Sequence, residues 1–244
     1  MRATLESLRE TGSFDDPASE VTRVQPIGRP SQEVPVDALE YHIFSPQRAR
    51  DPLLEDAYEV WRSVWLASFE SVHGVYRLHS DQFVRQDQIA VISAGGRCIS
   101  LMGLRRLDLS LARVRHDSYF EPWPDEVLAS LPDRIVGVTS NLAVHPDWRG
   151  ATVMSPRSPE DSTRLSSLTI ALSVRSSFAS AVDSVIALTR NDRSVDKLAS
   201  SLGAAKLGQI TMHRTDADIV RFDRANAVTR GCVADELWER RHQG

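Results

Sequence analysis

The stretch that most constrains the fold is residues 135–150, IVGVTSNLAVHPDWRG. It begins as a run of apolar and β-branched residues, which is typical of a buried strand. The run ends at Pro146, which favours a turn, and a cation and a glycine follow at Arg149 and Gly150. A strand that stops pairing at such a point leaves backbone N–H and C=O groups free for a ligand. The alternative is a buried strand that ends in an ordinary turn with a surface arginine.

The segment resembles motif A of the GCN5-related N-acetyltransferase (GNAT) superfamily, a strand ending in Leu-x-Val-x-Pro-x-x-Arg-Gly. The matching positions are Leu142, Val144, Pro146, Arg149 and Gly150. This resemblance implies an α/β (α+β) fold, with a mixed, mostly antiparallel central sheet flanked by helices. It also implies an N-acyltransferase whose co-substrate is an acyl-CoA or acyl-carrier-protein thioester. The residues expected to hold the pantetheine arm are Leu142, Ala143, Val144, Arg149 and Gly150, and the backbone N–H groups around Leu142 and Val144 would stabilise the oxyanion.

Length and composition limit the class of protein. The chain has 244 residues, of which 41% are hydrophobic and 25% charged, enough for one large globular domain. A formal net charge of −4 disfavours a nucleic-acid partner, and we see no segment with the length and apolarity of a membrane span. Cys98 and Cys232 belong to no paired metal or redox motif, and the N-terminus lacks the apolar run of a secretory signal. We therefore expect a cytoplasmic protein without a metal.

The chain divides into an arm and a domain. Residues 1–38 are polar and interrupted by prolines, which predicts a flexible N-terminal arm ahead of an acyltransferase-like domain at 39–244. In that domain we predict strands at 39–44, 89–92, 98–104 and 184–189, and helices that begin at Pro52, Asp125, Leu165, Asn191 and Ala234. We also predict a long mobile loop at 151–164, and two strands within 207–222 around a turn at 215–218.

The helix that begins at Pro52 carries an apolar stripe with Trp61 and Trp65. Such a stripe is typical of core packing, and the alternative is that Trp61, Trp65 or Phe69 lines a pocket for an acyl chain or an acceptor. The segment that follows contains His73, His79 and Asp81, whose spacing matches no familiar zinc motif.

The middle of the chain is similar in order and spacing to acyl-homoserine lactone synthases and long-chain N-acyl amino acid synthases. The similarity rests on Arg62, the Asp81-x-Phe83 segment, the Arg106-Leu107 pair and the strand that begins at Ser140. It implies a small amine as acceptor, such as an amino acid, with acyl carrier protein as a possible partner. The expected substrate contacts are Arg62, Trp65, Arg106, Ser140 and Asn141.

The sequence departs from these families at several catalytic positions. The glutamate often held to be the general base falls on Val138, and the tyrosine that protonates the thiolate falls on Ala199. The base must then be another group or water, and we consider Glu70, His73, His79, Asp81 and His145, with Asp81 and His145 as the catalytic candidates.

A further departure concerns the donor. No glycine occurs between Gly150 and Gly203, whereas CoA binders usually have a glycine-rich diphosphate loop there, and this favours a carrier-protein donor. Two alternatives stay open, an acetyl-CoA-dependent N-acetyltransferase and a non-catalytic acyltransferase-like binding module.

Overall fold

The computed structural model describes residues 32–74, 78–131, 134–212 and 214–243, all of which lie in one compact unit, Ser31–Gly244. This unit is built on an eight-stranded sheet of order β11-β2-β3-β4-β5-β8-β10-β9. Neighbouring strands are antiparallel except for the pairs β5–β8 and β11–β2. The predicted mixed, mostly antiparallel sheet flanked by helices is therefore confirmed.

The elements follow one another with short connections. The strands of the large sheet are β2 (Leu39–Phe44), β3 (Gln88–Ala94), β4 (Arg97–Asp108), β5 (Ile135–Val144), β8 (Ser184–Arg190), β9 (Ala205–Met212), β10 (Thr215–Asp223) and β11 (His242–Gln243). A smaller sheet contains β1 (Glu33–Pro35), β6 (Thr152–Ser155) and β7 (Ser158–Arg164). The α-helices are α1 (Pro52–His73), α2 (Asp81–Val84), α3 (Ala112–Arg115), α4 (Asp125–Ala129), α5 (Leu165–Ala179), α6 (Val195–Ser201) and α7 (Cys232–Glu239), and 3-10 turns occur at Val36–Ala38, Pro146–Trp148 and Asn191–Arg193.

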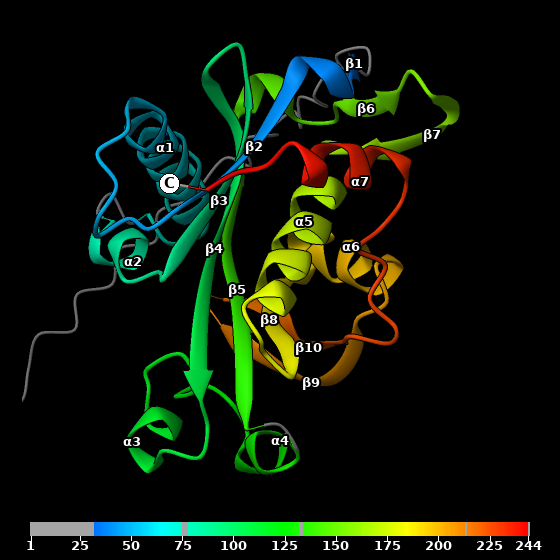
Figure 1. The fold of residues 1–244 in the computed structure, drawn as a ribbon. Helices are drawn as coiled ribbons and strands as arrows, with labels where there is room; N and C mark the ends of the chain where they lie inside the picture. Colours follow the sequence, from blue (N-terminus) through cyan, green and yellow to red (C-terminus); the bar gives the residue numbers. More distant parts are fainter. Residues whose placement is uncertain (1–31, 75–77, 132–133, 213, 244) are drawn as a thin grey trace, which may run out of the picture. The chain divides into compact units, whose positions relative to one another are not determined.

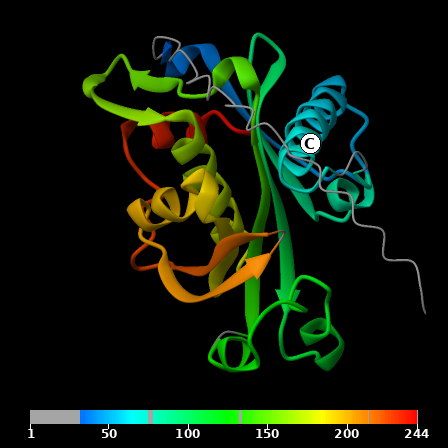
Figure 2. The ribbon, with the colours of Figure 1, turned by 180° about the vertical axis from the view of Figure 1, so that it is seen from behind.

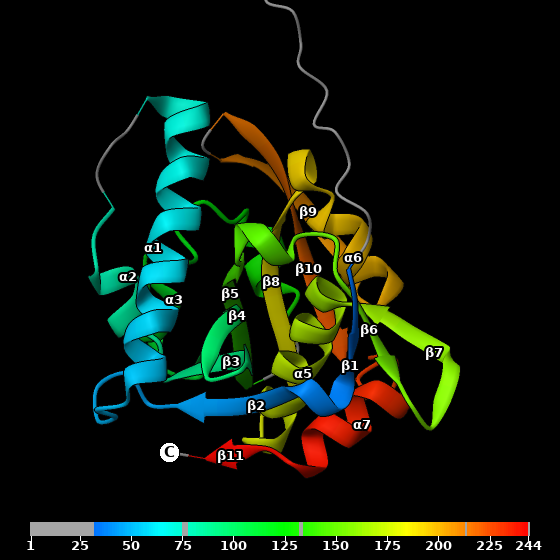
Figure 3. The ribbon, with the colours of Figure 1, turned by 90° about the horizontal axis from the view of Figure 1, so that it is seen from above.

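Helices cover both faces of the large sheet. Helices α1 and α2 lie on one face, and α5, α6 and α7 lie on the other (Figures 1 and 2). Helix α1 begins as predicted, because the Asp51 carboxylate accepts the N–H of Leu53 at 2.8 Å and Pro52 takes the first helical position. Viewed from above, the sheet separates α1 from α5 (Figure 3).

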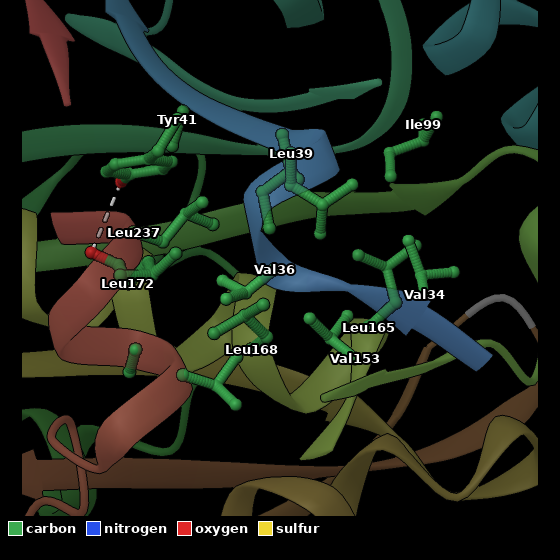
Figure 4. Close-up of a cluster of buried hydrophobic side chains, with 14 of the residues drawn as sticks. Val34, Val36, Leu39, Tyr41, Ile99, Val153, Leu165, Leu168, Leu172 and Leu237 are labelled. Atoms are coloured by element: carbon green, nitrogen blue, oxygen red, sulfur yellow. Dashed lines mark hydrogen bonds between the residues drawn. The ribbon is translucent and has the colours of Figure 1, made fainter. Parts of the chain in front are cut away.

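Helix α5 is the most buried helix of the fold, and its serines are compatible with that burial. The hydroxyls of Thr169, Ser176 and Ser177 each donate to the carbonyl four residues earlier, so the helix satisfies these three side chains itself. Helix α5 packs against β2, α7 and β6 in one apolar cluster, where the Tyr41 hydroxyl donates to the carbonyl of Leu172 at 3.2 Å (Figure 4). The predicted helix is confirmed despite the low helix propensity of serine.

The prediction of a loop at 151–164 is wrong. The segment forms the hairpin β6–β7, and β6 pairs in parallel with β1 through Val34 and Val153, both of which are buried. The Leu165 N–H donates to the carbonyl of Ala151 at 2.9 Å, so the hairpin closes at its base. Serine and threonine are common in loops, but here they lie in strands because β1 pairs with β6 and β6 pairs with β7.

The predicted turn at 215–218 also lies inside a strand, β10. The Asp218 side chain is buried and ion-paired with Lys206 at 2.8 Å, and this ion pair offsets the free-energy cost of burying a carboxylate within a strand. The Asn191–Asp192 dipeptide forms a 3-10 turn, and α6 begins only at Val195.

The folded unit includes part of the predicted arm. Val34 is 6% exposed and Val36 fully buried, so residues 32–38 are anchored to the folded unit by these two side chains. The rest of the arm prediction, up to residue 31, lies outside the described residues. Across the described ranges, none of the helices combines the length and the apolar character that a bilayer crossing requires.

Candidate functional site

Strands β5 and β8 separate at the centre of the sheet. Their parallel pairing covers only Val136–Val138 against Ser184–Ile186, although β5 continues to Val144 and β8 to Arg190. Beyond this point the facing edges of the two strands pair with no other strand in the described part of the chain. The open edge that the sequence predicted at the end of this strand is therefore present.

A bulge interrupts β5 where the separation begins. Gly103 of β4 pairs with Ser140, and Leu101 pairs with Ala143, so Asn141 and Leu142 together face one residue of β4. Asn141 has a φ of 59°, in the left-handed region that asparagine tolerates better than most residues. The bulge redirects the backbone at the point where the two strands part.

The backbone N–H group of Val144 faces the open edge, and that of Leu142 lies in the bulge beside it. The His145 N–H donates to the carbonyl of Ile99 on β4 at 2.9 Å, and Ala143 is paired with Leu101 of the same strand. Because N–H groups alternate in direction along a regular antiparallel strand, that of Val144 is aimed away from β4, towards β8. Leu142 belongs to the bulge, where this alternation is interrupted. The Val144 N–H is therefore available to a ligand at this edge, and the role of both N–H groups as oxyanion donors stays a prediction.

A cavity of about 510 Å³ occupies the gap between β5 and β8. We call it the wedge cavity. It is lined by Val64, Trp65, Ala67, Ser68, Ser71, Met102, Thr139, Ser140, Asn141, Leu142, Arg149, Ile170, Ala187, Leu188, Thr189, Arg190, Arg193, Val195, Ala199 and Phe222. Its lining comes from both helical faces and from four strands of the sheet, so the cavity passes through the sheet at the split. Apolar side chains dominate, and the charged groups are three arginines.

A second cavity of about 280 Å³ lies on the α1 face of the sheet. We call it the side cavity. Its walls include residues of α1, α2, the segment before α4, and β10, among them Phe69, Arg85, Gln86, Arg105 and Tyr119. Both cavities are lined by Trp65, Thr139, Ser140, Asn141, Leu188 and Arg190. The two cavities therefore share a wall at the β5 bulge, where two bound molecules would meet.

Two polar side chains in the shared wall have no protein partner. The Thr139 hydroxyl and the Trp65 indole nitrogen are both buried and make no hydrogen bond within the described residues. Buried polar atoms are nearly always paired in folded proteins, so an unpaired one calls for a ligand or water as its partner. Both atoms can therefore take a ligand or a water as their partner.

The arginines of the cavities fall into two groups. Arg105 makes a two-point contact with Asp117, at 2.7 and 3.2 Å, and Arg190 binds Asp192 in the same manner. The hydrogen bonds from Arg105 hold the pKa of Asp117 below its usual range. By contrast, the guanidinium of Arg149 makes no hydrogen bond or ion pair with any residue that the structure describes. Arg149 is thus a free cation at the wedge cavity.

Arg85 and Arg193 hold their partners loosely. Arg85 lies 3.5 Å from Asp81 with both side chains more than half exposed, and Arg193 lies 3.6 Å from Asp192. Loose, exposed pairs are worth little, so both cations can turn to a ligand. No carboxylate or imidazole occurs among the described residues that line the two cavities.

The structure brings part of the predicted site together. Trp65, Ser140 and Asn141 line both cavities, and Leu142 and Arg149 line the wedge cavity. Two family positions that carry other residues here also fall in the cavities, with Ala199 in the wedge cavity and Val138 in the side cavity. Ala143 and Val144 lie on the same strand but pack into the two apolar cores.

The remaining predicted residues lie outside both cavities. Arg62 and Arg106 are exposed, and Gly150 is exposed with a φ of 83°. Asp81 begins α2 and faces Arg85, and the His145 ring accepts the N–H of Asp147 in a local turn at 3.3 Å. Among the described residues, no group of three or more metal-ligating side chains is close enough to hold an ion.

Sequence reasoning missed Arg105 and selected its neighbour Arg106. The period of two along β4 could have separated them, because Arg105 falls on the same face as Leu101 and Gly103, beneath α1. It also missed Gln86 and Arg193, for which the sequence contains no local signal.

Comparison with known proteins identifies the fold. Compared by sequence, the chain matches no protein-family model and none of the curated proteins. Compared by structure, it is similar to BjaI, a CoA-dependent acyl-homoserine lactone synthase, with a TM-score of 0.53 at 12% identity over 84% of this chain and 93% of that one. It is also similar to FeeM, an N-acyl amino acid synthase from uncultured soil microbes, with a TM-score of 0.51 at 10% identity over 81% and 97%.

A third similar structure is that of the mosquito protein named arylalkylamine N-acetyltransferase like 5b, with a TM-score of 0.53 at 14% identity over 75% of this chain and 98% of that one. At such identities the likeness shows the fold alone. The fold predicted from motif A is confirmed, and its activity has to be argued from the site.

Proposed function

We propose that this chain, which has the acyltransferase fold of these synthases, transfers an acyl group from a pantetheine thioester to the amine of a small acceptor. The observation that carries the proposal is the shared wall at Ser140–Leu142, where two cavities meet beside free backbone donors. A transfer between two substrates requires a site for each and a point of contact between them. The wedge cavity serves the donor and the side cavity serves the acceptor.

The donor fits the open edge of β5. Pantetheine carries two amides, which can pair with unpaired backbone groups as an added strand would. The thioester carbonyl then lies near the N–H groups of Leu142 and Val144, which stabilise the charge that develops on its oxygen. Arg149, free of protein partners, binds the donor's phosphate. The apolar lining of the wedge cavity accommodates the acyl chain.

The acceptor fits the side cavity. Its amine approaches the bulge beside Ser140, and a carboxylate on the acceptor is attracted by Arg85. An amino acid has both groups at a suitable spacing, and the aromatic wall formed by Trp65 and Phe69 packs against its side chain. The substrates are held in line, which lowers the barrier without a dedicated nucleophile.

Proton transfer relies on water in this site. No carboxylate or imidazole lines the described cavity walls, so the amine loses its proton to solvent and reacts as the neutral form. The leaving thiolate is protonated by solvent as well, because Ala199 stands at the position of the family tyrosine. The rate should therefore rise with pH up to the pKa of the acceptor amine rather than show a bell-shaped profile.

Acyl carrier protein is the donor favoured by the connection after Gly150. The hairpin β6–β7 occupies the sequence position of the glycine-rich loop that binds the CoA diphosphate. A carrier protein presents a single phosphate, for which Arg149 is a sufficient partner. CoA is the alternative carrier.

The test is thiol release from acyl-CoA and acyl-carrier-protein thioesters of several chain lengths, against pooled amino acids and amines. We expect turnover of at least one thioester and a ten- to hundredfold lower kcat/KM for Arg149→Ala, about 1.5–3 kcal/mol for a lost charged hydrogen bond. Arg62→Ala is the matched control, because Arg62 is exposed and lines neither cavity. Turnover of acetyl-CoA alone would favour the acetyltransferase, and binding without turnover would favour a non-catalytic module.

A further inference from the structure

The bulge in β5 is held from outside the strand by helix α2 and the residues that follow it. The Asn141 amide donates to the backbone carbonyl of Gln82 at 3.1 Å, and the Gln86 amide donates to the same carbonyl at 2.9 Å. The Ser140 hydroxyl donates to the Gln86 side-chain oxygen at 3.3 Å. The bulge residue Asn141 and the residue before it, Ser140, are thus tied to one short segment, 82–86.

The Gln82 carbonyl is free to accept both amides because the helix ends early. In a longer helix it would accept the N–H of residue 86, but that N–H donates to Phe83 instead, at 3.2 Å. The four-residue helix therefore leaves one carbonyl directed at the bulge, and the side chains of Asn141 and Gln86 satisfy it.

The segment that holds the bulge is itself firmly packed. Phe83 is 3% exposed, and its ring lies 5.4 Å from each of the rings of Tyr58 and Trp61 on α1. On its other side the Asp87 carboxylate accepts the N–H of Arg106 on β4 at 2.7 Å. The segment is therefore fixed to both α1 and the sheet, and it can transmit a defined position to the bulge.

The Gln86 side chain fits against a glycine. It is 5% exposed, and a Cβ atom at Gly103 would lie 2.8 Å from its carboxamide carbon. A side chain at residue 103 would occupy the same space. The close approach of Gln86 to β4, opposite Ser140, thus depends on the glycine.

We infer that Asn141 and Gln86 are positioning residues, which hold the bulge so that the Leu142 N–H stays aimed at the thioester carbonyl. The inference rests on the proposed acyl transfer. Asparagine suits the position for two reasons, since it tolerates a φ of 59° and its amide reaches the Gln82 carbonyl. A donor fixed before the reaction stabilises the oxyanion without reorganisation.

Three substitutions at residue 141 separate these two reasons. Asn141→Gly keeps the φ and removes the amide, and Asn141→Asp keeps the size and tolerance but cannot donate to a carbonyl. Asn141→Ala loses both features. Gln86→Met keeps the volume and removes both hydrogen bonds. Asn226→Ala is the matched control, because Asn226 is an exposed residue outside both cavities.

Kinetics with the best thioester form the first measurement. We expect kcat to fall at least about tenfold in Asn141→Ala, Asn141→Asp and Gln86→Met, with the donor KM changed less than about threefold, since the donor's other contacts remain. The kcat of Asn141→Gly should lie between those of these variants and that of the wild type. An unchanged kcat in Asn141→Asp and Gln86→Met would overturn the inference, and urea unfolding shows whether each variant is folded.

The second measurement needs no turnover. An acyl pantetheine phosphate with a methylene in place of sulfur carries a ¹³C-labelled ketone, whose infrared band shifts to lower frequency when N–H groups donate to it. We expect that shift in the wild type and its loss in Asn141→Asp. A band shift without turnover in the wild type would refute the proposed transfer but support the positioning role. An equal shift in Asn141→Asp and the wild type would overturn the positioning role, and an analogue that does not bind would overturn both.

Discussion

Gly103 should be required for stability because of the side chain packed against it. An alanine Cβ at this position would lie 2.8 Å from both the carboxamide carbon and the oxygen of Gln86, closer than folded proteins allow. The φ of Gly103 is not in the left-handed region, so backbone strain does not contribute. The cost of Gly103→Ala is therefore the cost of moving the Gln86 side chain.

The geometry sets the magnitude of that cost. The Gln86 side chain makes two hydrogen bonds, with Gln82 and Ser140, and each contributes about 1 kcal/mol to the free energy of unfolding. Overpacking a buried site adds about 1–3 kcal/mol. We expect Gly103→Ala to lower the free energy of unfolding by about 3–5 kcal/mol.

A double-mutant cycle in urea isolates the contact. Gln86→Ala alone should lower the free energy of unfolding by about 1–3 kcal/mol. Adding Gly103→Ala to it should lower this free energy by less than about 1 kcal/mol more, because the Gln86 side chain that the new Cβ would meet is gone. The coupling should therefore be at least about 2 kcal/mol. Additive effects of the two substitutions would refute the proposed packing of Gln86 against β4.

Three further predictions test other parts of the fold. Hydrogen bonds from Arg105 lower the pKa of Asp117 in the folded state. The stability that they contribute is fully present above the unfolded pKa near 4, and it is lost as the pH falls through the folded pKa. Asp117→Asn should therefore lower the free energy of unfolding by about 1–2 kcal/mol at pH 7 and by progressively less as the pH falls through the lowered pKa, measured by urea unfolding across pH. Trp61→Ala should lower the free energy of unfolding by about 3–5 kcal/mol, because Trp61 is buried in the core. Trp65→Ala should lower it clearly less but should weaken substrate binding, because Trp65 lines the cavities and Trp61 does not. Equal losses of stability in the two variants would contradict this. Burial raises the pKa of the Cys98 thiol, so it should resist alkylation at pH 8 until the chain is unfolded, as followed by mass spectrometry.

Local patterns predicted most elements of the fold. The Asp51-Pro52 pair defined the start of α1, and the two glycines at 95 and 96 defined the turn between β3 and β4, where both adopt a positive φ. These elements depend on residues a few positions apart, whose propensities act before any tertiary contact forms. Motif A likewise located the end of β5, because its proline follows Val144, the last residue that pairs with β4. It did not show that pairing with β8 already ends at Val138.

The rest of the site depends on contacts between distant segments. Hairpin β6–β7 forms against β1, more than a hundred residues away, and no local pattern reports that pairing. The bulge at Asn141 depends on a carbonyl of residue 82, and the roles of Arg105 and Arg106 depend on the register of β4. Such features are determined by tertiary structure, which overrides local propensity.

The shared wall of the two cavities has a kinetic consequence. Neither cysteine lines the cavities, and Ser140 and Asn141 line both the acceptor space and the donor space. Both substrates would therefore have to be bound together, and the acyl group would pass directly between them without residing on the protein. Initial-velocity plots at several acceptor concentrations should then intersect, whereas parallel lines would indicate an acylated intermediate.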